Sequence, residues 1–285
     1  MNFCSRASLA ADERFAGTGV RGEAYVFLPV PKRLWRDKEM NRAWASAEEL
    51  ETLRAARRAG VVTRLYDTDG EDEAALVYTR DGVASDQVRA LLSVVARRWR
   101  LDEARKPRLA ICTHGTRDRC CAKWGFAAYR AARELFDAQA SVFEPLQCSH
   151  LGGDRFAATG IFFPSGDMYA HLDDLDLAAL AAAEAAGRLE PDHYRGRVFD
   201  AQLVQVVRAG LAKIGLLNDA TAPLVLGPHA GPELEAECGG RRFHVRLDTA
   251  KVQFYGSCED IDTGRTSTTR RTFVAAAEEL GGHPP

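Results

Sequence analysis

The sequence reads CTHGTRDRCCAKWGF at residues 112–126 and QCSHLGGDRFAAT at residues 147–159. These two stretches hold four of the seven cysteines and two of the seven histidines of the chain. Thiols and imidazoles are the ligands that soft and borderline metal ions prefer. We therefore expect the chemistry of the chain to lie in these two loops, with the rest of the molecule acting as scaffold.

The segments around the two loops predict an α/β fold. RLAIC at 108–112 has the apolar run of a buried strand, and a helix over 121–137 and a strand over 141–147 follow it. A hairpin over 156–172 and a helix over 175–187 complete the order β-α-β-β-α. Both loops then follow the carboxyl ends of strands, where open α/β sheets gather their ligands.

The same order of elements occurs once before. Its predicted members are strands over 24–30, 61–67 and 74–79 and helices over 45–60 and 85–99. Ser46 followed by Glu49 predicts a capping box at the start of the first of these helices. No residue-level repeat links the two halves, so structural duplication and ordinary α/β alternation both stay open.

The last third of the chain has a different pattern. A helix is expected over 200–215, followed by a small antiparallel β meander in which Gly239–Gly240 forms a hairpin turn. Residues 1–23 are polar and aperiodic, which predicts a loop. We therefore divide the chain into an N-terminal α/β domain (1–102), a second α/β domain (103–190) and a C-terminal helix with a meander (191–285).

Composition excludes several classes of protein. The chain has 285 residues, 46% hydrophobic content and a net charge of −2, which is typical of a globular protein without a nucleic-acid or anionic membrane surface. The apolar runs are too short to span a bilayer, and the N-terminus has no apolar signal region, so we expect a cytoplasmic protein. In that setting an odd number of cysteines favours metal or redox chemistry over a disulfide framework.

The spacing of the cysteines and histidines predicts one ligand centre. Eight residues separate Cys112 from Cys121, so the intervening loop can bring both sulfurs together. Cys148 and His150 face the same way if the backbone between them is extended. Two thiolates and an imidazole suit zinc or an iron–sulfur cluster. Because no tight C-x2-4-C knuckle is present, the wide spacing favours a [2Fe–2S] cluster over a single ion.

Both loops resemble the sucrase/ferredoxin-like family, through CTHGTRDRCC and CSHLGGDRFAAT. Other segments similar to that family are CSRAS at 4–8, GTG at 17–19, VPKRLW at 30–35 and HYRGRVFDAQLVQ at 193–205. The resemblance extends over roughly residues 1–210. It implies a thioredoxin-like fold for the second domain, related to the thioredoxin-like ferredoxins. Some relatives hold a [2Fe–2S] cluster with two cysteines and two histidines.

The ligand pattern of those relatives maps onto this chain with one departure. Their C-x8-C pair falls on Cys112 and Cys121, and the first histidine of their H-x3-H pair falls on His150. The second histidine is replaced by Asp154, and a carboxylate is a hard, uncommon cluster ligand. We prefer Cys148 as the fourth ligand and keep Asp154 as the alternative. Asp154 would otherwise support the site or pair with its neighbour Arg155.

Three functions are compatible with these residues. The first is an iron–sulfur electron-transfer or redox-sensing protein that acts with an unidentified partner protein. The second is a thiol–disulfide redox protein on the same fold, and the third is a non-catalytic protein with a decayed cluster site. We assign no catalytic residue. The residues expected to support the ligands without binding the cluster are His114, Arg117, Asp118 and Arg155. We expect Cys4 and Cys258 to be ordinary thiols and Cys120 to be a bystander, with its exchange for Cys121 as a ligand as the alternative.

Overall fold

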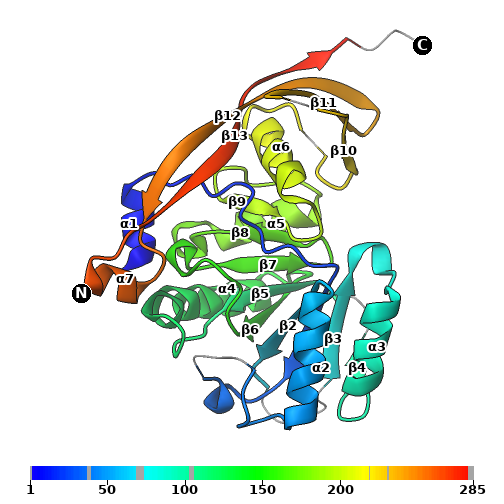
Figure 1. The fold of residues 1–285 in the computed structure, drawn as a ribbon, viewed down its shortest axis with the longest axis vertical. Coiled ribbons are helices and arrows are strands. Elements are labelled where there is room, and N and C mark those ends of the chain that lie inside the picture. Colours follow the sequence, from blue (N-terminus) through cyan, green and yellow to red (C-terminus); the bar gives the residue numbers. More distant parts are fainter. Residues whose placement is uncertain are drawn as a thin grey trace.

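The computed structural model describes residues 2–36, 40–68, 74–102, 106–217, 219–229 and 231–281. Its main feature is a nine-stranded mixed sheet (Figure 1). The strands of this sheet are β1 (Ala24–Pro29), β2 (Val61–Tyr66), β3 (Ala74–Thr79), β4 (Arg100–Asp102), β5 (Arg108–Cys112), β6 (Glu144–Cys148), β7 (Gly160–Phe163), β8 (Asp167–Tyr169) and β9 (Tyr194–Arg197). They are arranged in the order β4-β3-β1-β2-β6-β5-β7-β8-β9.

The two halves of this sheet have the same pairing pattern. β1 pairs parallel with β2 and antiparallel with β3, and β5 pairs parallel with β6 and antiparallel with β7. The halves meet where Tyr66 of β2 pairs with Cys148 of β6. A structural duplication would produce this shared pairing pattern, and so the duplication stays one of the two explanations. The boundaries after residues 102 and 190 stay a prediction, and β9, which follows the second boundary, is the last strand of the same sheet.

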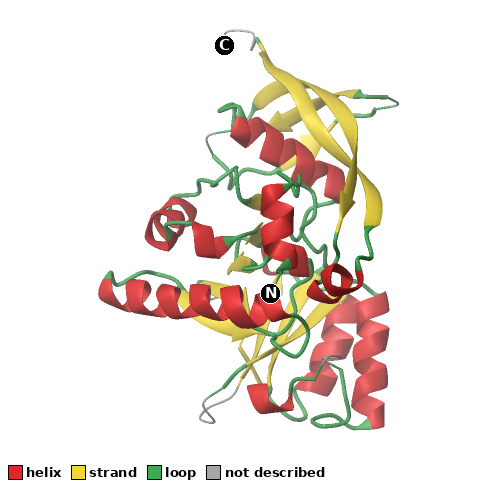
Figure 2. Cartoon of the chain, turned by 90° about the vertical axis from the view of Figure 1, so that its left-hand side faces the viewer, coloured by secondary structure: helices red, strands yellow, loops and turns green. Residues whose placement is uncertain are grey.

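Helices cover the sheet in pairs. The helices of the chain are α1 (Cys4–Ala10), α2 (Ala47–Arg58), α3 (Asp86–Val95), α4 (Phe126–Ala138), α5 (Leu177–Ala185), α6 (Gln202–Lys213) and α7 (Cys258–Thr263). α2 contacts α3 beside the first half of the sheet, and α4 contacts α5 beside the second (Figures 1 and 2). The predicted capping box of Ser46 and Glu49 is confirmed at the start of α2. None of the described helices is both long and apolar enough to cross a membrane.

The C-terminal third forms a second sheet. Its strands are β10 (Leu224–Leu226), β11 (Glu233–Cys238), β12 (Arg241–Phe254) and β13 (Ser267–Leu280), paired antiparallel in that order. Gly239 and Gly240 have φ of 58° and 76°, as the predicted tight turn requires. The expected α/β class with an antiparallel meander is therefore confirmed. β12 is one continuous strand over residues 241–254, and β13 was not among the predicted elements.

The long β12–β13 ribbon brings the tip of the C-terminal sheet to the start of the chain. The ribbon crosses the molecule and places α7, which links its two strands, against α1 (Figure 1). The prediction that residues 1–23 form only loop is wrong, because residues 4–10 are helical. A helix this short is not stable by itself, so packing must hold it. Cys4, Ser5 and Ser8 supply its buried side.

His171 packs against the end of the second loop, at Phe156 and Ala157. Its Nδ1 lies 3.2 Å from the carbonyl oxygen of Ala157, and its ring packs edge-on against Phe15 and Phe156. The side chain is fully buried, and this burial lowers the pKa of His171 to about 4. The native protein therefore keeps this imidazole neutral at pH values where the unfolded chain protonates it.

We expect His171 to make the protein less stable in acid. As the pH falls from about 6.5 to about 4, His171 is protonated in the unfolded state but stays neutral in the native state. This difference lowers the free energy of unfolding by about 3 kcal/mol over that range. His171→Asn replaces the imidazole with a side chain that does not titrate, and Asn tolerates the φ of 51° at this position. Urea unfolding at a series of pH values should show a shallower acid slope in the variant. Equal slopes would contradict the assignment.

Candidate metal centre

Three predicted ligands meet at one point. Cys112 ends β5, Cys121 begins the π-helical turn η3 (Cys121–Gly125) before α4, and His150 follows β6. One ligand atom from each lies within 4.8 Å of the other two, and the two Sγ atoms are 3.3 Å apart. Both thiols are buried, and the imidazole is 19% exposed. The convergence of the two loops that the sequence predicts is therefore observed.

Gly125 allows the first loop to close on the strand. A Cβ at this position would lie 2.0 Å from the carbonyl oxygen of Cys112, far inside any real contact. The π-helical turn therefore lies directly against the end of β5, and Cys121 at its start is held beside Cys112. Single π-helical turns inside helices occur often at functional sites.

The second loop is fixed by its neighbours on both sides. Cys112 and Cys148 are partners in the parallel register of β5 and β6, so the two loops start side by side. The backbone N–H of His150 donates to Nδ1 of His114, whose Nε2 lies 2.7 Å from the carbonyl oxygen of Arg36. His114 therefore positions the backbone that carries His150 and is itself engaged at both ring nitrogens.

Asp154 reaches back to the centre from the turn that follows. Gly152 and Gly153 have φ of 94° and 79°, a conformation that glycine adopts without strain. The Asp154 Oδ1 lies 3.0 Å from Nδ1 of His150 and 3.9 Å from Sγ of Cys121. Cys148 is buried beside the centre, but its Sγ lies outside the group of three ligand atoms.

Of the other residues expected to support the ligands, only Arg117 contacts Asp154 among the described pairs, and Arg155 and Asp118 lie elsewhere. Arg117 Nε lies 3.7 Å from Asp154 Oδ2. Arg155 does not form the expected pair with Asp154 among the described contacts. Its Nε instead donates to Glu13 Oε1 at 2.8 Å. Asp118 belongs to a separate group of side chains on the other side of the turn.

That separate group was missed by the sequence analysis. It consists of Cys4, Asp118, Cys120 and Cys258, all buried. These residues are far apart in the chain and follow no ligand spacing. The one local signal is the adjacent pair Cys120–Cys121, since neighbouring side chains at the start of a helix point in different directions.

Burial and nearby charges shift the pKa values of the three ligands in different directions in the metal-free chain. The hydrogen bond between the two thiols and the nearby His150 lower the pKa of Cys112, and the same hydrogen bond raises the pKa of Cys121. Burial lowers the pKa of His150, but Asp154 and the Cys112 thiolate outweigh it and raise that pKa to about 9. These shifts favour a thiolate on Cys112 and an imidazolium on His150, and a cation that binds there must displace a proton.

His150 also lines a cavity with a volume of about 580 Å³. Among the described residues of this wall, the charged side chains besides His150 are those of Arg21, Arg54, Arg57, Arg64 and Arg117. The exposed edge of the centre therefore faces an electropositive hollow.

We predict that His150 titrates near pH 9 in the metal-free protein. Asp154→Asn removes the carboxylate that holds the proton, so the pKa should fall toward or below about 6.5. Histidine resonances in NMR spectra across a pH series measure both values, and the signals of the remaining histidines serve as the control. An unchanged His150 pKa in the variant would contradict the role given to Asp154.

Comparison with known proteins gives one result for this chain. The sucrase/ferredoxin-like family matches residues 16–196, which is more than half of the chain and includes both loops and the strands that carry them. The search among curated proteins and the search among solved structures found no match. The family resemblance expected from the two motifs is therefore confirmed, and the chain belongs to the sucrase/ferredoxin-like family.

Proposed function

We propose that the chain holds a [2Fe–2S] cluster on Cys112, Cys121 and His150 and serves in electron transfer or redox sensing. The observation that carries this proposal is that two loops at one end of the sheet bring Sγ of Cys112 and Cys121 to 3.3 Å, close enough to bind one iron, and place His150 beside them, where it would bind the second iron. When bound, such a cluster accepts and releases one electron at a time. The chain supplies the ligands, the dry pocket and the surrounding charge.

The donor set suits this cofactor. Thiolates are the usual ligands of iron–sulfur clusters, and histidines replace some of them in sites of higher reduction potential. Burial of Cys112 and Cys121 keeps water from the sulfurs, and His150 at the edge connects the centre to the surface. A neutral imidazole in place of a thiolate also makes the site more positive, which favours reduction.

The arrangement around the ligands supports a thioredoxin-like ferredoxin domain over residues 103–190. Its elements follow in the order β5, α4, β6, β7, β8 and α5, which is the expected β-α-β-β-α order with one additional strand. Residues 1–102 and 191–285 are then an N-terminal α/β domain and a C-terminal addition. We also propose a cytoplasmic location, where thiols stay reduced.

The fourth ligand is either Asp154 or Cys148. Cys148 has the softer donor atom, but neither its Sγ nor an oxygen of Asp154 belongs to the group of three ligand atoms. Asp154 occupies the position of the second family histidine, and its Oδ1 lies 3.9 Å from Cys121 Sγ. We therefore take Asp154 as the fourth ligand and treat Cys148 as the competing assignment.

The partner protein should carry an acidic face. The cavity at the exposed edge of His150 is lined, in the described part of the chain, by five arginines. Complementary charge guides association and orientation between redox partners. An acidic surface would bring a partner to the edge where His150 approaches solvent.

A thiol–disulfide redox protein is the second candidate function. The specific observation in its favour is the 3.3 Å separation of Cys112 and Cys121 Sγ, with the pKa of Cys112 lowered by the hydrogen bond from Cys121. Such a pair can be oxidised to a disulfide without metal. The two candidates differ in colour and in their content of iron and sulfide.

We expect anaerobically purified protein to be brown and to contain iron and acid-labile sulfide in equal amounts. Cys112→Ser should lose both, because serine does not replace a thiolate ligand. Cys238→Ser is the matched control, since Cys238 is also buried but lies in β11. Comparison of Asp154→Ala with Cys148→Ala identifies the fourth ligand by which variant loses the cluster.

Two results would contradict the proposal. Colourless protein without sulfide, together with a disulfide between Cys112 and Cys121, would favour the second candidate. Full iron and sulfide content in Cys112→Ser would show that the cluster lies elsewhere. If Cys148→Ala loses the cluster and Asp154→Ala keeps it, our assignment of Asp154 is wrong.

A further inference from the structure

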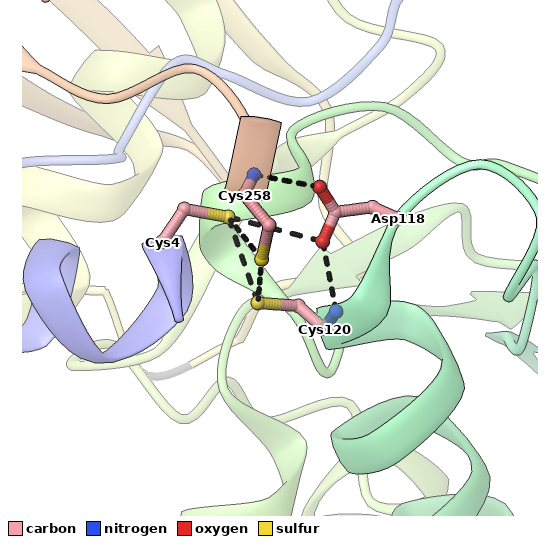
Figure 3. Close-up of side chains that lie close together, drawn as sticks. All are labelled: Cys4, Asp118, Cys120 and Cys258. Carbon is pink, nitrogen blue, oxygen red and sulfur yellow. Dashed lines mark hydrogen bonds between the residues drawn. The ribbon is translucent and has the colours of Figure 1, made fainter. Parts of the chain in front are cut away.

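Three more cysteines and one aspartate meet on the other side of the π-helical turn. The Sγ atoms of Cys4, Cys120 and Cys258 are 3.3 to 3.7 Å apart, and all three side chains point toward one another (Figure 3). Asp118 closes the group, with Oδ1 4.0 Å from Sγ of Cys4. All four ligand atoms lie within 4.8 Å of one another.

These side chains come from three distant parts of the sequence. Cys4 lies in α1, Asp118 and Cys120 lie in the loop before α4, and Cys258 begins α7. The thiols are at most 2% exposed. Cys4 and Cys258 also lie outside residues 16–196, the range that the family matches. The group is therefore a feature of this chain beyond the family match.

We propose that Cys4, Cys120, Cys258 and Asp118 bind one zinc ion. Three thiolate sulfurs at about 2.3 Å from a tetrahedral zinc ion lie about 3.8 Å from one another. The observed separations of 3.3 to 3.7 Å need only a small expansion to reach that value. A carboxylate oxygen is an accepted fourth ligand for zinc, and its hardness disfavours copper(I).

The hydrogen bonds around the group hold the ligands in place. Asp118 Oδ1 accepts from the backbone N–H of Cys120, and Oδ2 accepts from that of Cys258, each at 2.8 Å. Ser5 Oγ donates to Sγ of Cys120 at 3.2 Å. Arg119 adds a positive charge at the rim, where its Nη2 donates to the carbonyl oxygen of Cys258. These contacts stabilise negative charge on the sulfurs and on Asp118.

The same distances argue against the other uses of clustered cysteines. A disulfide would join only two of the three thiols, and all seven cysteines of the chain are free. A cubane iron–sulfur cluster would need its sulfurs much farther apart, because several metal atoms would lie between them. Three thiols around one small central space suit one ion.

The proposed zinc ion would join the start of the chain and the tip of the C-terminal ribbon to the first centre. It would link α1 and α7 to Cys120, and the next residue, Cys121, is a ligand of the proposed cluster. The ion would therefore fix the start of the turn that places Cys121 beside Cys112. Loss of zinc should loosen α1 and α7 first, since they are short and depend on this contact.

Metal analysis of the full-length protein tests the proposal. We expect one zinc per chain in Cys112→Ser, which lacks the iron ligand set, and the same amount in the control Cys238→Ser. Cys4→Ser and Cys258→Ser should lose this zinc while they keep the iron of the first centre. Because zinc and iron are counted separately, failure of one site leaves the other site testable.

A spectroscopic measurement keeps the test valid if a cysteine variant fails to fold. Zinc-edge X-ray absorption of Cys112→Ser should show three sulfur neighbours at about 2.3 Å and one lighter neighbour. Removal of zinc by a chelator should speed hydrogen exchange in α1 and α7 but leave α6 unchanged. Protein that holds no zinc after incubation with it, or folded Cys258→Ser that keeps a full equivalent, would overturn the proposal. A zinc site with nitrogen neighbours would overturn it as well.

Discussion

The contact between Gly125 and the end of β5 is the constraint on which the rest depends. The π-helical turn passes so close to the carbonyl oxygen of Cys112 that no side chain fits between them. Cys121, at the start of that turn, is thereby held with its sulfur 3.3 Å from that of Cys112. Cys120, one residue earlier, must then point away, toward α1 and α7. One backbone contact therefore divides two adjacent cysteines between two centres.

The sheet and the C-terminal ribbon each serve one of these centres. The parallel register of β5 and β6 starts both ligand loops at the same edge, where His150 completes the first group of ligand atoms. The ribbon of β12 and β13 carries Cys258 across the molecule to Cys4 and Cys120. The first centre is thus built by the part that the family shares, and the second also needs α1 and α7, which lie outside that part.

Local sequence patterns predicted what depends on local physics. The apolar runs, the capping box at Ser46 and the turn at Gly239–Gly240 all appear as expected, because each depends on a few neighbouring residues. The convergence of Cys112, Cys121 and His150 was also predictable, since strand order places them at one edge. α1 was not predictable, because packing rather than its own sequence stabilises it. The gathering of Cys4, Cys120 and Cys258 depends on the path of a long ribbon, which no spacing encodes.

The most direct test of whether Cys120 and Cys121 belong to two different metal centres is a crystal of the anaerobically purified protein. Diffraction is measured on both sides of the iron and zinc absorption edges. We expect anomalous density for iron between Cys112, Cys121 and His150, and separate anomalous density for zinc between Cys4, Cys120 and Cys258. A single metal position, or the same metal at both positions, would contradict the division of the two adjacent cysteines between an iron–sulfur centre and a zinc centre.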